Sequence, residues 1–263
     1  KWAGANASEL TGEPDYADGA ALAEFSAPSS DPSGNPKSGS KSGPSSSSPG
    51  PRAERSVSRQ LTQFGELNLK KQTLKALQGM GYSDPTPIQS GSIPTVQSGV
   101  DVMGQARTGT GKTAAFMIPI VEGVSELEAT GSPLALVVAP TRELAVQIRN
   151  EAEKIAKYYD ISIAACYGGT PLASQVERLR KGVDIVIGTP GRIIDLSTKR
   201  HALSLDSVRW VVLDEADRML DIGFRPDVER ILRMTPSTRQ TLLFSATLAP
   251  PVVRLAERYM KDP

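Results

Sequence analysis

The sequence predicts an α/β domain in which helices cover both faces of a parallel β-sheet. Three observations carry this prediction. Apolar runs rich in β-branched residues recur from residue 60 onward, amphipathic segments of helical length separate them, and polar or glycine-rich turns follow most of the apolar runs. Strands that alternate with such helices form crossover units, which make the strands parallel. Ligands of these sheets bind beyond the carboxyl ends of the strands, where the turns lie.

The elements of this domain follow from the spacing of apolar residues. Short continuous apolar runs are typical of strands that are buried on both faces, whereas apolar residues three and four apart indicate helices. The predicted strands are 101–105, 134–139, 161–167, 184–188, 208–213 and 240–245. The predicted helices between them are 113–120, 143–158, 174–181, 192–198 and 226–234.

Composition sets an N-terminal segment apart from this domain. Residues 26–51 are dominated by Ser, Pro and Gly, which cannot bury enough apolar surface to offset the entropy of ordering the backbone. We therefore expect a disordered tail over residues 1–55 and a folded domain over 56–263. Residues 1–50 contain six acids and three bases, a net charge of −3. The whole chain has a net charge of +1, so residues 51–263 carry +4. This mild excess is compatible with a local nucleic-acid surface without predicting one.

Other features of the sequence bear on the cellular compartment. Cys166 is the single cysteine, which excludes an intramolecular disulfide and suits a reducing environment. No apolar run approaches the roughly 18–20 residues that a membrane helix needs. The N-terminal region has no basic stretch followed by an apolar one, and residues 1–50 contain no Arg, so secretory and organellar leaders are not indicated. We expect a cytoplasmic protein that does not associate with membranes.

A glycine-rich turn lies between the first predicted strand and the next helix. It consists of Ala106, Arg107, Thr108, Gly109, Thr110, Gly111, Lys112 and Thr113. Two glycines allow a tight curl that directs successive N–H groups at one anion, the lysine can hold β- and γ-phosphates, and the final threonine hydroxyl suits Mg²⁺. The general phosphate-loop pattern begins with Gly, so Ala106 departs from it. A purely structural turn would leave the Lys-Thr pair unexplained.

The predicted strand 208–213 ends in a run of acids, Asp214-Glu215-Ala216-Asp217. The Asp214 carboxylate can reach a metal ion directly or through water, and Glu215 can orient or deprotonate an attacking water. Acids at a helix N-terminus would also complement the helix dipole, but that interpretation explains neither the strand nor the glycine-rich turn. We predict a magnesium–nucleotide site with Lys112, Asp214 and Glu215 as catalytic residues, and with Thr113 and Asp214 as the metal ligands.

A third segment, residues 81–89, precedes the first strand and reads GYSDPTPIQ. The Gln89 amide offers a donor and an acceptor, the complement of the adenine N6/N7 edge. The Tyr82 ring can stack on a base. Taken alone, Tyr82 and the upstream Phe64 would more often be core aromatics, and it is the run from Pro85 to Gln89 that favours a base-binding role.

These three segments resemble the DEAD-box family of ATP-dependent RNA helicases. The resemblance covers about residues 60–263 and corresponds to the first RecA-like domain of the family, in which Ala at the first loop position is common. It implies a RecA-like P-loop fold and ATP with Mg²⁺ as ligands. It also implies that Gln89 and Tyr82, together with Phe64, select ATP over GTP.

Three further turns match the family. Pro140, Thr141 and Arg142 follow the second predicted strand, Gly168 and Gly169 the third, and Thr189, Pro190, Gly191 and Arg192 the fourth. Small residues, hydroxyls and arginines at helix N-termini suit phosphate and ribose contact rather than base readout. Turn and capping chemistry is an alternative for Gly168 and Pro190. The resemblance implies that these turns bind the backbone of single-stranded RNA without sequence specificity.

The last motif, Ser245-Ala246-Thr247, follows the strand 240–245. By resemblance it couples the nucleotide state to strand separation, partly through contact with the acidic run at Asp217. The resemblance stops there, and we expect the second RecA-like domain, which supplies arginines to the γ-phosphate in the family, to be missing from this chain. We therefore expect a monomer that binds ATP weakly and hydrolyses it poorly alone. The sequence leaves three functions open: an RNA helicase, an ATP-gated RNA clamp, and a P-loop ATPase with a partner other than nucleic acid.

Overall fold

The computed structural model describes residues 63–263, in which six parallel strands form one sheet. The strands are β1 (Val102–Gln105), β2 (Ala135–Val138), β3 (Ile163–Cys166), β4 (Ile185–Gly188), β5 (Trp210–Leu213) and β6 (Gln240–Ser245). Their order across the sheet is β1-β6-β5-β2-β4-β3. Each strand lies within one of the six predicted runs, which confirms the parallel α/β fold. The predicted tail, residues 1–55, lies outside the described residues.

Nine α-helices connect and flank these strands within residues 63–263. They are α1 (Lys71–Gly79), α2 (Pro87–Gln97), α3 (Lys112–Val124), α4 (Arg142–Ile155), α5 (Leu172–Arg180), α6 (Pro190–Ile194), α7 (Ala216–Asp221), α8 (Arg225–Met234) and α9 (Pro250–Tyr259). Shorter turns of helix are η1 (Phe64–Glu66), η2 (Ala156–Tyr158) and η3 (Asp195–Lys199). The five predicted helices are confirmed with shifted ends. Within the described part of the chain, no helix is long and apolar enough to cross a bilayer.

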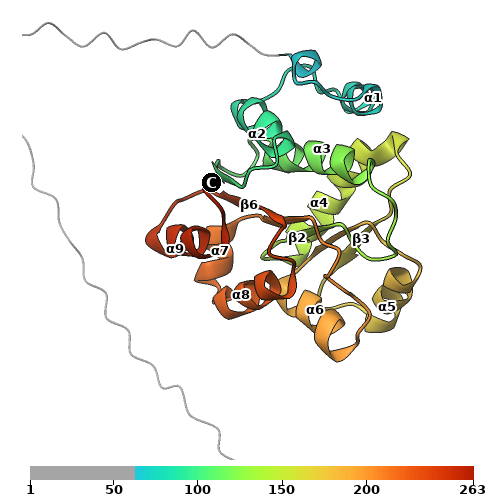
Figure 1. Cartoon of the computed structure of the whole chain (residues 1–263), viewed down its shortest axis with the longest axis vertical. Helices are drawn as coiled ribbons and strands as arrows, with labels where there is room; N and C mark the ends of the chain where they lie inside the picture. Colours follow the sequence, from blue (N-terminus) through green and yellow to red (C-terminus); the bar gives the residue numbers. More distant parts are fainter. Residues whose placement is uncertain (1–62) are drawn as a thin grey trace, which may run out of the picture. The chain divides into compact units, whose positions relative to one another are not determined.

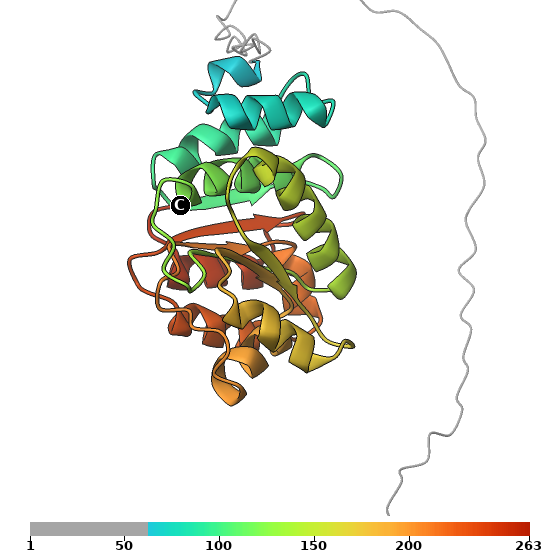
Figure 2. The same ribbon diagram turned by 90° about the vertical axis from the view of Figure 1, so that its right-hand side faces the viewer.

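The helices form a layer on each face of the sheet, as Figures 1 and 2 show. Helices α2, α3 and α4 cover one face, and α5 to α9 cover the other. Successive strand residues point to opposite faces, so Val137 packs in the first core and Val138 in the second. Both cores consist of buried and mostly aliphatic side chains, which explains why the strand sequences are apolar without alternation.

Gly104 in β1 allows the close packing of the first core. A Cβ atom at this position would lie 2.6 Å from the ring of Phe244, which itself packs against Phe116 in a tilted arrangement with ring centroids 5.3 Å apart. We predict that Gly104→Ala lowers the free energy of unfolding by about 1–3 kcal/mol, because the added methyl forces the packed ring to shift. Urea unfolding measures this.

The matched control for that substitution is Gly91→Ala in α2. A Cβ at Gly91 meets no atom within 4 Å, and Ala is favoured over Gly inside a helix. The control should be neutral or stabilising. If Gly104→Ala were as stable as the wild-type chain, the packing of β1 against Phe244 described above would be wrong.

Candidate nucleotide and nucleic-acid site

The register of the sheet brings the turns of interest to one edge. Val138, the last residue of β2, pairs with Gly188 of β4 and with Leu213 of β5. Gly188 in turn pairs with Cys166, the last residue of β3. In the strand pair β1 and β6, on the other side of β5, Gln105 pairs with Ser245 at the ends of these two strands. Every segment that follows these strands therefore starts at the same carboxyl edge, where ligands of parallel sheets bind.

The glycine-rich loop and the acidic run meet at this edge. Lys112 Nζ lies 3.6 Å from Asp214 Oδ1, and both side chains are buried, with exposed fractions of 6% and 3%. Burial raises the pKa of Asp214 to about 6, against the opposing effect of the Lys112 charge. Among the described residues, Lys112 Nζ has no hydrogen-bond partner. A buried ammonium with donors left over is suited to bind an anion rich in oxygen atoms.

The loop itself has the backbone conformation that its glycines allow. Gly109 and Gly111 have φ values of 83° and 88°, in the left-handed region that favours glycine. The Thr110 hydroxyl donates a hydrogen bond to the carbonyl of Arg107 at 2.7 Å, which closes the turn. Helix α3 begins directly afterwards at Lys112, so its N-terminal N–H groups point into the loop.

Glu215 has an unusual backbone conformation for a residue with a side chain. Its φ and ψ are both 52°, a left-handed conformation that costs about 1–2 kcal/mol in an L-residue. Three hydrogen bonds hold it there. Its N–H donates to Asp214 Oδ1 at 2.9 Å, and its carboxylate accepts from Thr108 at 3.2 Å and from Arg218 at 3.3 Å. The chain thus leaves the strand sharply, and both adjacent acids lie at the loop.

Gln89 connects the upstream segment to the phosphate loop. Its Oε1 accepts from the Thr86 N–H at 2.8 Å and its Nε2 donates to the Gly111 carbonyl at 3.1 Å. The side chain is buried, and a Cβ on Gly111 would overlap its amide. One N–H and one lone pair of the amide remain. Contact with an adenine edge stays a prediction, and the structure adds that this residue fixes α2 to the loop.

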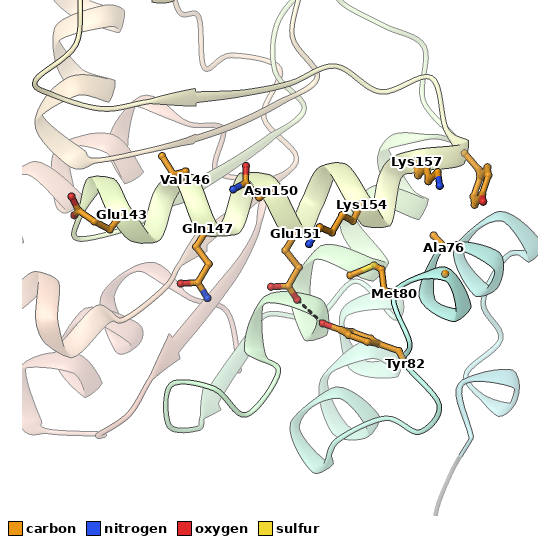
Figure 3. A pocket seen from close by; sticks show the side chains of 12 residues that line it. Ala76, Met80, Tyr82, Glu143, Val146, Gln147, Asn150, Glu151, Lys154 and Lys157 are labelled. Carbon is orange, nitrogen blue, oxygen red and sulfur yellow. Dashed lines mark hydrogen bonds between the residues drawn. The ribbon is translucent and has the colours of Figure 1, made fainter.

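The two aromatic residues of the predicted base site lie together. The Phe64 and Tyr82 rings stack with centroids 6.3 Å apart and an interplanar angle of 23°. Phe64 is buried and Tyr82 is half-buried. The Tyr82 hydroxyl donates to Glu151 on α4 at 3.1 Å, drawn as a dashed line in Figure 3. Burial and the negative charge of Glu151 raise the pKa of Tyr82 to about 12. Contact of the Phe64 and Tyr82 rings with a base stays a prediction.

The three predicted RNA-binding turns occupy the other half of the edge, after the neighbouring strands β2, β4 and β3. The Thr141 hydroxyl caps α4 by accepting from the Leu144 N–H at 3.2 Å. The Arg142 guanidinium lies 5.0 Å from the centroid of the Tyr167 ring. Capping and a cation–π contact therefore give part of this turn a structural role as well.

Arg192 lies at the start of α6, in the turn after β4. Considering residues 63–263 alone, its buried Nη1 has no hydrogen-bond partner. The neighbouring Cys166 thiol is buried, and burial raises its pKa to about 12 although the Arg192 charge acts in the opposite direction. Cys166 is thus a packed core residue, whereas Arg192 has a donor that no described residue satisfies.

The predicted contact between the acidic run and the last motif is present in the structure. Asp217 Oδ2 accepts from the N–H of Thr247 at 2.9 Å and from its hydroxyl at 3.0 Å, and the Asp217 N–H donates to Ser245 Oγ at 3.2 Å. Burial alone would raise the pKa of Asp217, but hydrogen bonding to its carboxylate, from the Arg218 N–H at 3.0 Å and then from Thr247 and Ser245, lowers that pKa below its usual range. The Ala246 carbonyl accepts from the Gln105 side chain at 3.3 Å, which ties the motif to the end of β1.

Among the contacts at this site that were not foreseen from the sequence, three involve residues that none of the motifs contains. They are those of Gln105 with Ala246, Arg218 with Glu215, and Glu151 with Tyr82. Arg218 could have been found, because a base three residues after an acid on a helix is a common ion pair. The other two join residues distant in sequence, for which a single sequence carries no signal.

The fold and this edge define a P-loop nucleotide-binding domain of the RecA-like type. The family model "DEAD/DEAH box helicase" matches residues 86–255, about two thirds of the chain. The chain therefore belongs to the DEAD/DEAH box helicase family, as the motifs indicated.

Individual relatives agree with this assignment. The chain is 49% identical over 203 residues to the DEAD-box ATP-dependent RNA helicase CshA of Geobacillus kaustophilus, a match that covers 77% of this chain and 43% of the relative. It is 45% identical to the ATP-dependent RNA helicase CshA of Listeria monocytogenes, covering 77% and 38% respectively. The chain thus spans about two fifths of the length of these relatives. The crystal structure of a DEAD box protein from Methanococcus jannaschii superposes with a TM-score of 0.72 at 42% identity, over 76% of this chain and 54% of that one.

Proposed function

We propose that residues 56–263 are the N-terminal ATP- and RNA-binding domain of an ATP-dependent RNA helicase that hydrolyses ATP to ADP and phosphate. The observation that carries the proposal is the buried contact of Lys112 with Asp214 at 3.6 Å, on the same sheet edge as the turns that contain Arg142 and Arg192. With this arrangement, a nucleotide site and an RNA-backbone site would lie side by side.

The phosphate loop and Lys112 would bind the triphosphate of ATP. The N–H groups at the start of α3 and the Lys112 ammonium are donors from the same turn of the chain. Phosphate oxygens would satisfy the donors of Lys112 that Asp214 leaves over. On the base side, Gln89, Tyr82 and Phe64 would select adenine.

A divalent cation fits the oxygen groups at this position. The Thr113 hydroxyl at the start of α3 and the Asp214 carboxylate at the end of β5 are both buried, and hard oxygen donors are those that Mg²⁺ prefers. These two side chains would hold Mg²⁺ directly or through water. When bound, Mg²⁺ neutralises negative charge on the β- and γ-phosphates.

Glu215 would act on the attacking water. In hydrolysis the water oxygen forms a bond to the γ-phosphorus, the bond from that phosphorus to the ADP oxygen breaks, and the water loses a proton. The Glu215 carboxylate lies at the loop, where Thr108 and Arg218 orient it. It is placed to take that proton or to orient the water.

In the longer protein we propose that a second RecA-like domain completes the ATP site and that RNA stimulates turnover. Arginine fingers contribute about 10³–10⁵ to the rate in related phosphoryl-transfer systems, so this chain alone should turn over slowly. The proposal is tested by measuring ATP binding to this chain with and without single-stranded RNA. If RNA neither binds nor changes ATP affinity, a P-loop ATPase with another kind of partner becomes the better explanation.

The RNA side of the proposal makes a prediction for Arg192. Replacing Arg192 with Ala should weaken binding of single-stranded RNA by about three- to tenfold, equally for oligo-U, oligo-A and mixed sequences, because a backbone contact carries no sequence information. The slope of log affinity against log salt should also become shallower by about one. Fluorescence anisotropy with labelled oligonucleotides measures both quantities.

Arg180→Ala is the matched control for that experiment, because Arg180 is exposed at the far end of α5. It should leave RNA affinity nearly unchanged. An Arg192→Ala effect confined to one base sequence, or no larger than that of Arg180→Ala, would remove Arg192 from the backbone contact.

A further inference from the structure

Helix α4 runs past both the proposed nucleotide site and the proposed RNA site. It begins at Arg142, in a turn proposed to bind RNA, and packs against α3, which begins in the phosphate loop. Glu151 lies nine residues after the start of α4, about 13 Å along its axis. Its side chain points toward Tyr82, as Figure 3 shows.

The Glu151 carboxylate contacts the base side of the proposed nucleotide site. Its Oε1 accepts the hydrogen bond of the Tyr82 hydroxyl at 3.1 Å. Burial raises the pKa of Glu151, while hydrogen bonding from Tyr82, the charge of Lys154 and, more weakly, the Thr113 hydroxyl act in the opposite direction. The hydrogen bond of this carboxylate is thus with the base side of the proposed site.

The hydrogen bond to Tyr82 lies in a groove between the α1 region and α4. The groove has a volume of about 790 Å³, and Met80 and Tyr82 line one side of it while Asn150, Glu151 and Lys154 line the other. The Tyr82 ring is half-buried and packs against the first core, and its hydroxyl points toward α4. The hydrogen bond crosses the groove and holds that ring, against which Phe64 stacks.

We propose that Glu151 is a positioning residue for base recognition: from α4 it holds the Tyr82 ring, and through it Phe64, in the place where adenine binds. This inference rests on the proposed function, because it assumes that the Phe64 and Tyr82 pair contacts the base. It adds a residue of α4 that none of the sequence motifs contains.

The test compares two ligands of the wild-type chain and its variants, ATP and inorganic tripolyphosphate, each with Mg²⁺. Tripolyphosphate carries the phosphates without a base. Glu151→Ala and Tyr82→Phe should each weaken ATP binding about tenfold, which is the lower end of the range expected for loss of a hydrogen bond to a charged group. Neither substitution should change the affinity for tripolyphosphate. The double variant should be no weaker than either single one, because both remove the same contact. Glu151→Gln, whose amide oxygen can still accept from Tyr82, should restore most of the affinity.

Glu153→Ala is the matched control, since Glu153 is an exposed residue of α4 whose contact is an ion pair with Arg149 at 3.9 Å. It should bind both ligands as the wild-type chain does. Isothermal titration measures the affinities, and thermal unfolding verifies that each variant is folded.

Two outcomes would overturn this inference while the proposed nucleotide site stands. One is wild-type ATP affinity in Glu151→Ala, and the other is an equal loss of ATP and tripolyphosphate affinity, which would mean that the carboxylate acts on the phosphate loop through Thr113. A wild-type chain that binds neither ligand would instead reject the proposed site, and the inference with it.

Discussion

Replacing Lys112 with Ala is expected to abolish ATP binding at micromolar to millimolar nucleotide concentrations. The Lys112 ammonium is buried beside Asp214 and retains donors that the described residues do not satisfy. Truncating one partner of a buried charge pair costs about 2–5 kcal/mol, which corresponds to a loss of affinity of about thirty- to several thousandfold. The loss should be similar for ATP, GTP and tripolyphosphate, because the lysine contacts the phosphates that all three share.

This substitution also removes the positive charge next to a buried carboxylate, so folding needs its own measurement. Without Lys112, the Asp214 carboxyl can protonate more readily, because burial already raises its pKa to about 6. The variant Lys112→Ala combined with Asp214→Asn removes the buried charge altogether and provides a folded reference. Lys181→Ala, at an exposed ion pair on α5, is the surface control and should bind ATP normally. A folded Lys112→Ala chain with unchanged ATP affinity would show that the loop is not the phosphate site.

The strands of this fold could be predicted from sequence because the sheet is buried on both faces. Val186 and Ile187 of β4 point to opposite cores and are both fully buried, so the strand reads as one apolar run. Helices α2 and α7, in contrast, could not be predicted from the pattern of apolar residues. Pro94 lies inside α2, and α7 has only six residues, less than two turns.

The edge at which the motifs gather was predictable because every motif except residues 81–89 follows a strand, and parallel strands share one carboxyl edge. What could not be predicted is how the motifs contact one another. The left-handed conformation of Glu215 has no sequence signal, since glycine or asparagine normally marks that region. The hydrogen bonds of Gln89 with Gly111 and of Tyr82 with Glu151 join residues 22 and 69 positions apart, so only the packing of α2 and α4 reveals them.

Replacing Glu215 with Gln is expected to leave ATP binding intact and to slow hydrolysis by about 10²–10⁴-fold, the usual contribution of a general base. The amide keeps the size of the side chain and an oxygen that can accept from Thr108, so the geometry at the loop should persist. It cannot take a proton from water. Binding and chemistry should therefore separate in this variant, in contrast to Lys112→Ala.

Single-turnover hydrolysis, with this chain in excess over ATP, measures the chemical step without product release. Glu257→Gln on α9 is the matched control, because Glu257 is exposed and the change is chemically identical. Glu215 has a strained backbone, which costs stability and persists in proteins where surrounding contacts require it, often at functional sites. If Glu215→Gln hydrolysed ATP at the wild-type rate, the contacts from Thr108 and Arg218 would be holding a structural carboxylate. The water would then have to be activated by another group at this edge, with Asp214 the adjacent candidate.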